Sequence, residues 1–156
     1  MQQPSPQPSF RPAFTVPMAD AVHEQRDAEF IQLLDAFRAS GGLARGIDVA
    51  GLLRQGHERG AAMVSRWIAG GDVLHFRWHE DDWLPMFQFV RPGMAPQSAL
   101  RRVLAELDSV LDDWDLARWF ARPNPWLGGA LPADLLATRA VQVEQAARAD
   151  RFAFRG

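Results

Sequence analysis

Apolar side chains follow the helical period over the first part of the chain. A helix is expected from Asp27, a capping residue, to the stop signal at Ser40-Gly41-Gly42. Its apolar positions have the i, i+3, i+4, i+7 spacing of an amphipathic helix: Phe30, Leu33, Leu34 and Phe37. Asp48 can cap a short second helix, and residues 61–69 form a third that ends at a glycine pair. The pattern therefore predicts three helices, of which the second and third are close neighbours.

The pattern changes to alternation in the segment DVLHFRWHEDDWLPMFQFV, residues 72–90. Two apolar and aromatic runs flank the polar turn 79–82, which is typical of a β-hairpin. In the first run Leu74, Phe76 and Trp78 fall on one face. Pro85 has no N–H for the ladder, so we expect the second strand to lie at a sheet edge or to carry a bulge. Three helices followed by a hairpin is the element order of a winged helix-turn-helix.

The second half of the chain is expected to be helical. A strong amphipathic helix runs from Leu100 to Leu111, and Asp112 or Asp113 caps the next one, which holds residues 114–121. Two further helices are expected at 133–138 and 141–149. The predicted fold class is therefore mainly α with one β-hairpin (α+β). We expect three parts: a disordered, Pro-rich arm (1–18), a winged-helix-like unit of three helices and a hairpin (19–92), and a C-terminal helical domain (96–156).

Composition narrows the function classes. The 156 residues include no cysteine, which excludes disulfides, thiolate metal sites and thiol catalysis. The start MQQPSPQPS lacks the basic and apolar regions of a secretory signal, and no run approaches the roughly 20 apolar residues of a membrane span. We therefore expect a cytoplasmic protein with no membrane partner. A net charge of -2 argues against a protein that coats nucleic acid.

Candidate catalytic and metal-binding groups are few. His75, His79 and the acidic run 80–82 cluster on the hairpin and could hold a divalent cation or act as acid and base. His75 lies in a strand, however, and the others lie in an exposed turn, where carboxylates are commonly just solvated. The sequence has no serine in a strand-to-helix elbow and no glycine-rich phosphate loop. It therefore predicts a non-enzymatic protein with no metal and no cofactor.

A stiff and apolar corner interrupts the C-terminal helices at WFARPNPWLGGALPADLL, residues 119–136. Pro132 suits a first helical turn, a glycine pair lets the backbone reverse, and Asn124 can hydrogen-bond within its own loop. Trp126 either fills the core of the domain or stands out as a partner anchor. The tryptophans of the regular elements are expected in the core: Trp67, Trp78, Trp114 and Trp119.

The spaced residues of this corner resemble the toxin-binding domain of the Xre/MbcA/ParS-type bacterial antitoxins. The similar residues are a tryptophan-led helix, Pro123-Asn124, Leu127-Gly128-Gly129, and Pro132 before Asp134-Leu135-Leu136. The resemblance covers about residues 96–156. It implies a non-enzymatic interaction protein, the antitoxin of a type II toxin–antitoxin pair. The partner that it implies is a toxin, often one with a RES domain that consumes NAD.

By the same resemblance, the C-terminal domain docks on the toxin and pushes its terminus toward the toxin's active site. Here the terminus ADRFAFRG, residues 149–156, would be that plug, since arginine among aromatic residues is typical of interface anchors. The alternative is a frayed tail whose two phenylalanines fold back on the body. A homodimer, or a hetero-oligomer with the toxin, is expected. The predicted partner-binding residues are Pro123, Asn124, Trp126, Leu127, Arg151, Phe152, Phe154 and Arg155.

The chain departs from the family pattern at two places. The stretch after Leu136 lacks the glycine that the family has before its last helix, which leaves the register of that helix open. The N-terminal half carries a hairpin instead of a compact all-helical DNA-binding domain, so DNA binding has to be argued from the residues. Arg59, Ser65 and Arg66 are candidate DNA contacts, whereas a wing tipped with Glu80-Asp81-Asp82 would be repelled by phosphate. A DNA-binding transcriptional regulator and a stand-alone helical module with a non-toxin partner therefore stay open as alternatives.

Overall fold

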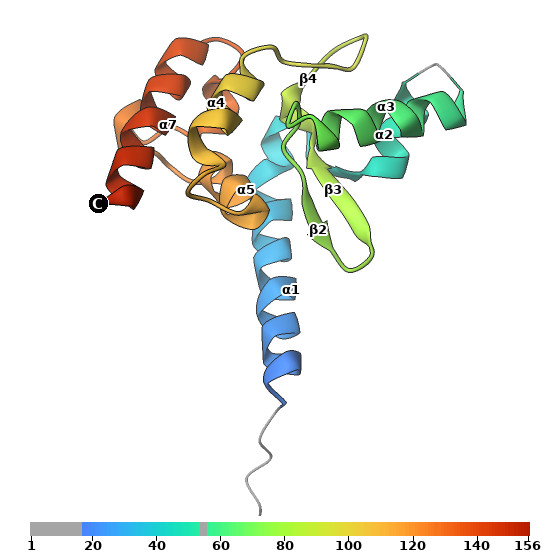
Figure 1. The fold of residues 1–156 in the computed structure, drawn as a ribbon, viewed down its shortest axis with the longest axis horizontal. Helices are drawn as coiled ribbons and strands as arrows, with labels where there is room; N and C mark the ends of the chain where they lie inside the picture. Colours follow the sequence, from blue (N-terminus) through green and yellow to red (C-terminus); the bar gives the residue numbers. More distant parts are fainter. Residues whose placement is uncertain (1–16, 54–55) are drawn as a thin grey trace, which may run out of the picture.

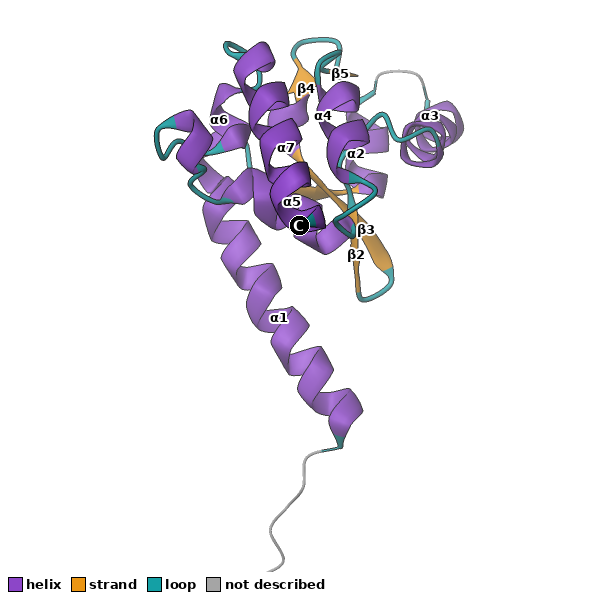
Figure 2. Ribbon diagram, turned by 60° about the vertical axis from the view of Figure 1, so that its left-hand side comes forward, coloured by secondary structure: helices purple, strands orange, loops and turns teal. Residues whose placement is uncertain are grey.

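A computed structural model describes residues 17–53 and 56–156 of the chain. These residues are mainly helical with a small antiparallel sheet, which confirms the predicted fold class (Figures 1 and 2). The α-helices are α1 (Met18–Phe37), α2 (Gly46–Leu52), α3 (His57–Ala69), α4 (Leu100–Leu107), α5 (Asp113–Ala121), α6 (Pro132–Leu135) and α7 (Ala140–Arg155). The strands are β1 (Leu43–Arg45), β2 (Phe76–Trp78), β3 (Asp81–Pro85), β4 (Phe89–Val90) and β5 (Ala95–Pro96). Short 3-10 helices lie at Arg38–Ser40, Met86–Gln88 and Pro125–Leu127.

The predicted hairpin is present as β2 and β3, but it belongs to a three-stranded sheet of order β1-β3-β2. Phe76 lies opposite Trp83 in the hairpin, and Leu43 of β1 lies opposite Pro85. The expectation that Pro85 places its strand at an edge is therefore wrong, because β3 is the central strand. The proline is tolerated because it is the last residue of β3, and the next N–H, that of Met86, donates to Gly42 O at 2.9 Å.

The second predicted strand does not continue to Val90. The chain turns after β3 into the 3-10 segment Met86–Gln88, and β4 then pairs with β5. Gln88 is fully buried. Its side-chain amide hydrogen-bonds the backbone of Leu74, as the backbone of a neighbouring strand would. Its Oε1 accepts from Leu74 N at 2.7 Å, and its Nε2 donates to Leu74 O at 2.9 Å and to Pro85 O at 2.8 Å. Each buried polar atom of this side chain has a partner, which is the condition for burying an amide at low cost.

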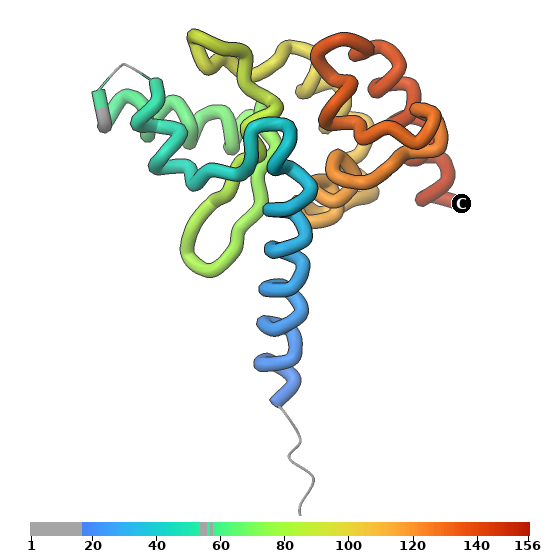
Figure 3. The backbone as a smooth tube through the Cα atoms, turned by 180° about the vertical axis from the view of Figure 1, so that it is seen from behind, coloured from blue at the N-terminus to red at the C-terminus, as the bar shows by residue number. Residues whose placement is uncertain are grey.

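Helix α1 begins nine residues earlier than its apolar stripe predicts. It starts at Met18 instead of Asp27, so the predicted arm loses its last residue to the helix, and residues 1–16 of that arm lie outside the described part. The extra turns bury no side chain and project from the body (Figure 3). Periodicity could not reveal them, because only a packed face needs apolar residues. Although α1 has 20 residues, no helix in the described ranges is both long and apolar enough to cross a bilayer.

Two core clusters hold the molecule together. The smaller one lies between α2, α3 and the strands and includes Val49, Val64 and Leu84. The larger one joins α1 and β2 to the C-terminal helices, with Phe37, Phe76 and Phe120 fully buried. It therefore crosses the boundary predicted between residues 92 and 96. In Figure 1, α1 stands between the α2–α3 pair and the α4, α5 and α7 group.

Helix α1 is fixed to both neighbours by polar and aromatic contacts. Phe30 stacks on Trp78 with ring centroids 3.7 Å apart, and the Trp78 indole donates to Asp27 Oδ1 at 2.9 Å. On the other side, Arg118 of α5 pairs with Glu29 at 3.1 Å. Asp27 is therefore a side-chain acceptor inside the helix and not its cap. These contacts make the winged-helix-like part and the C-terminal helices one packed body.

Gly60 of α3 packs directly against the backbone of α2. A Cβ added there would lie 2.4 Å from Ala50 O, which is backbone and cannot rotate away. We predict that Gly60→Ala lowers the free energy of unfolding by about 1–3 kcal/mol, because overpacking outweighs the gain in helix propensity. Urea denaturation monitored by circular dichroism measures this.

Gly51→Ala is the matched control. Gly51 lies in α2 with no atom within 4 Å of an added Cβ, so this change should keep or slightly raise the stability. Equal effects of the two substitutions would show that the contact between the helices does not constrain Gly60.

Candidate partner-binding surface

The Pro/Gly corner between α5 and α6 is a closed loop built around Asn124. The side chain of Asn124 caps the 3-10 turn Pro125–Leu127 by accepting from Trp126 N at 2.9 Å. Its own N–H donates to Ala130 O at 3.0 Å, and its carbonyl accepts from Gly129 N at 2.9 Å. Gly128 and Gly129 both have positive φ, which the reversal requires. The local prediction that Asn124 bonds within its own loop and that the glycines reverse the chain is confirmed.

Asp150 of α7 connects this corner to the last helix. Its Oδ2 accepts from Trp119 Nε1 at 2.8 Å and from Asn124 Nδ2 at 2.9 Å, and its Oδ1 accepts from Trp126 Nε1 at 3.0 Å. One carboxylate thus receives three donors from α5 and the corner. Hydrogen bonds to a charged acceptor are stronger than neutral ones. Sequence reasoning missed Asp150, because its partners are 24 to 31 positions away along the chain.

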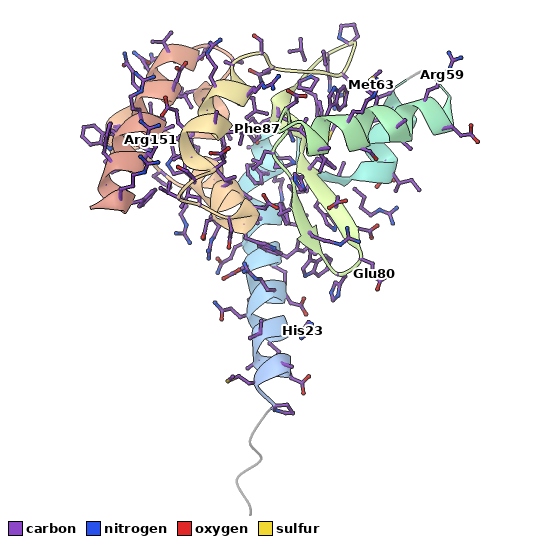
Figure 4. The ribbon with its side chains drawn as sticks, viewed as in Figure 1. His23, Arg59, Met63, Glu80, Phe87 and Arg151 are labelled. Atoms are coloured by element: carbon purple, nitrogen blue, oxygen red, sulfur yellow. The ribbon has the colours of Figure 1, made fainter. Side chains whose placement is uncertain are left out.

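Helix α7 continues to Arg155, six residues beyond its predicted end. The predicted terminus is therefore neither frayed nor folded back: Phe152 and Phe154 are helical and 62% and 53% exposed. Arg151 holds the last turns against α4 through an ion pair with Glu106 at 2.6 Å (Figure 4). Arg155 donates to Ser109 Oγ at 3.1 Å. The end of α7 is thus a fixed helical projection.

The predicted partner-binding residues fall into two groups. Pro123, Trp126, Phe152, Phe154 and Arg155 are exposed, and Trp126 shows 65% of its surface. Trp126 therefore does not fill the core, since most of its side chain is exposed while its indole N–H donates to Asp150. Asn124 is 4% exposed, and the carboxylate of Glu106 holds Arg151. Within the chain, both residues therefore organise the surface, and direct contact of either with a partner stays a prediction. Leu127 lies between the groups, half-buried against the main core.

Two hollows lie beside the corner, each with a volume of about 420 Å³. Hollow A has Trp126, Leu127 and Leu135 as its apolar wall and Arg139, Gln142 and Gln145 as polar lining. Hollow B lies on the side of Asn124 and Pro125 and is also lined by Leu111, Asp115, Arg118, Trp119, Arg122, Pro123, Asp150 and Phe154. The exposed tryptophan thus stands next to two concave surfaces that share apolar floors and arginine rims.

Arg118, at the back of hollow B, is a permanent positive charge. Burial opposes its charged form, but the hydrogen bond and charge of Asp115, with Glu29 and Asp112 nearby, raise the pKa of the guanidinium above its ordinary value. Its charge is compensated within the protein, since both Asp115 and Glu29 form ion pairs with it. Arg118 therefore stabilises the contact between α1 and α5 and has little charge left for a partner.

Residues 106–148 match the antitoxin Xre/MbcA/ParS C-terminal toxin-binding domain. The match confirms the resemblance predicted from the corner residues. The matched toxin-binding domain runs from the end of α4 into α7, and it includes the corner, Trp126 and both rim arginines, Arg122 and Arg139. No curated protein and no solved structure gave a significant match.

The predicted DNA contacts lie on α3, outside the matched residues 106–148. Arg59, Ser65 and Arg66 are exposed on α3, and Arg59 lies at its outer end (Figure 4). The hollow between α3 and the hairpin is lined by Ser65 but also by Glu80, Asp81 and Asp82. Arg77 lies beside them and is drawn to Asp82 at 3.6 Å. The structure therefore brings one predicted DNA contact together with three carboxylates.

The hairpin histidines do not form a chemical centre. His75 lies 3.8 Å from Asp82 and 4.0 Å from Asp113, whereas His79 lies 3.5 Å from Asp27. They therefore face different carboxylates. Among residues 17–53 and 56–156, no group of three or more His, Asp or Glu side chains is arranged to hold a metal ion.

Asp150→Asn tests the role of this carboxylate with almost no change of shape. The amide puts an N–H₂ group against donors, and Trp119 and Asn124 are 8% and 4% exposed, so water cannot replace the lost acceptor. We expect the free energy of unfolding to fall by about 2 kcal/mol, as for buried donors left unpaired. Chemical denaturation gives the value.

Asp108→Asn provides the comparison, because Asp108 is an exposed carboxylate at the end of α4. Its change should stay within about 0.5 kcal/mol. A similarly small effect at Asp150 would mean that its three hydrogen bonds do not fix the corner.

Proposed function

We propose that this protein is the antitoxin of a bacterial type II toxin–antitoxin pair, and that it covers the toxin's active site with the end of α7. The observation that carries the proposal is the coincidence of the family match with exposed apolar side chains. Trp126 and Val141 lie inside the matched residues, and Phe152 and Phe154 follow on α7. Exposed large apolar side chains also occur on α1 and α2, but here they coincide with the matched segment, and such side chains can mark an interaction site.

The proposed mechanism is occlusion by a preformed helix end. Arg151 and Arg155 anchor the last turns of α7 to Glu106 and Ser109, so the two phenylalanines project from a rigid support. A preorganised segment loses less conformational entropy on binding than a disordered one. The corner around Trp126 would supply the neighbouring contact area, and Phe152 and Phe154 would enter the toxin's cleft.

The partner class follows from the family resemblance. We propose a RES-type toxin that consumes NAD, with the catalysis residing in the toxin and a purely binding role for this chain. Homodimerisation, or a hetero-oligomer with the toxin, stays a prediction that the mass of the purified complex would measure.

Co-purification with the product of the neighbouring reading frame tests the proposal. The chain should retain that protein and silence its toxicity. Phe152→Ala/Phe154→Ala should weaken binding by about 2 kcal/mol or more per side chain if both enter a desolvated cleft. Ile47→Ala/Leu52→Ala, which removes two exposed apolar side chains from α2, should have no effect. Failure of the unmodified chain to retain the neighbouring protein would contradict the antitoxin function.

A truncated chain can distinguish binding of the toxin from inhibition of the toxin, provided that the chain keeps Asp150. A chain ending at Ala149 would lose the acceptor of Trp119, Asn124 and Trp126 together with the plug, so its failure would be ambiguous. A chain ending at Arg151 keeps these bonds and the ion pair with Glu106. It should still bind the toxin but no longer silence it. Full silencing by this shorter chain would overturn the occlusion mechanism.

The alternative of a DNA-binding regulator has one favourable observation, the exposure of Arg59, Ser65 and Arg66 on α3. If α3 binds DNA, retention on the operator of its own gene should fall steeply with salt, and Arg59→Ala/Arg66→Ala should reduce the slope by about two phosphate contacts. Electrophoretic mobility shifts at several salt concentrations measure this. Salt-independent or absent retention would leave the N-terminal part as a supporting platform.

A further inference from the structure

Two arginines beside the hollows form no ion pair within the described residues. Five arginines between residues 96 and 156 form ion pairs, and Arg155 is bonded to Ser109: the paired ones are Arg101, Arg102, Arg118, Arg148 and Arg151. In the part of the chain that the structure describes, Arg122 and Arg139 are the arginines of this domain with neither an ion pair nor a side-chain hydrogen bond. Arg139 borders hollow A and Arg122 borders hollow B.

Each of these charges stands beside an apolar floor. Leu127 and Leu135 form the floor next to Arg139, and Trp119 and Phe154 form the floor next to Arg122. Trp126 projects at hollow A, and its indole is held by Asp150, which lines hollow B. Each hollow therefore combines apolar side chains with one guanidinium that has no ion pair. Hollow B also holds two carboxylates, Asp115, which pairs with Arg118, and Asp150, which accepts the three N–H bonds of the corner.

This inference rests on the proposed function and deepens it. We propose that the toxin surface which docks on the two hollows is acidic as well as apolar, with apolar side chains filling the hollows and carboxylates pairing with Arg122 and Arg139. A guanidinium presents a planar fork that matches a carboxylate. Complementary charges at an interface speed the encounter and fix its register, whereas the apolar floors supply the affinity.

Charge and polarity favour an acidic and apolar toxin surface over a second copy of the chain and over a nucleic acid. A second copy of the chain, related by a twofold axis through this surface, would bring Arg122 and Arg139 against the same two cations. A nucleic acid would satisfy the arginines, but it would leave Leu127, Leu135 and Phe154 against a phosphate backbone. An acidic and apolar protein surface satisfies both kinds of group.

Charge reversal of the rim tests the proposal with the full chain and the toxin identified by co-purification. Arg122→Glu/Arg139→Glu should weaken toxin binding by about tenfold or more, and the loss should shrink as salt rises from about 0.05 to about 0.5 M. Isothermal titration calorimetry measures the affinity. The matched control is Arg59→Glu/Arg66→Glu, which makes the same change of net charge on α3 and should bind as the unmodified chain does.

The outcomes separate this inference from the proposed function. If the unmodified chain does not bind the toxin, the proposed function fails. If it binds and the rim variant binds equally well, the antitoxin function stands and the acidic partner surface is wrong. If the rim and α3 variants lose the same affinity, only net charge matters and the inference is overturned. If a single-stranded oligonucleotide displaces the toxin from the unmodified chain but not from the rim variant, Arg122 and Arg139 bind phosphate groups. The inference is then again overturned.

Discussion

The candidate partner-binding surface depends on the carboxylate of Asp150. Three donors from two other segments converge on it, and two of them, Trp119 and Asn124, are buried. Leaving such donors unpaired costs free energy, so this carboxylate stabilises the packing of the corner on α7. The chain lacks the glycine that the family has before its last helix, which left the register of that helix open in the sequence. The hydrogen bonds of Asp150 fix this register, and with it the direction in which Phe152 and Phe154 project.

The segment that matches the toxin-binding family model, residues 106–148, in turn depends on the N-terminal part of the chain. The main core cluster contains Phe37 of α1 and Phe76 of β2 as well as Phe120 of α5. Arg118 extends this contact to the surface by pairing with Glu29 of α1. Helix α5 therefore packs on α1 with one side and carries Trp119 toward Asp150 with another. A partner that docks on the corner would therefore contact residues that pack, through α5, on the winged-helix-like part.

The sequence predicted those features that have a local signal. The hairpin, α4, the Asp112 cap of α5 and the reversal at the glycine pair each depend on a few neighbouring residues. β1 has only three residues, too few to show alternation, and without it β3 could not be recognised as central. The first turns of α1 and the last turns of α7 are helical but mostly exposed, so no apolar stripe marks them. Asp150 and the exposure of Trp126 are tertiary properties, set by residues distant in sequence.

Exposed arginines occur on α3 and beside the corner, and the side chains around them differ. Arg59 and Arg66 project from an exposed face of α3 with small neighbours such as Ala62 and Ser65, and acidic residues of the hairpin lie close by. Arg122 and Arg139 lie beside aromatic and aliphatic floors. Affinity between proteins comes chiefly from large apolar and aromatic anchors, and charge adds specificity. The winged-helix element order therefore does not by itself locate the interaction site. Unpaired charge beside exposed apolar side chains is found at the corner and the end of α7, which supports the interaction site proposed there.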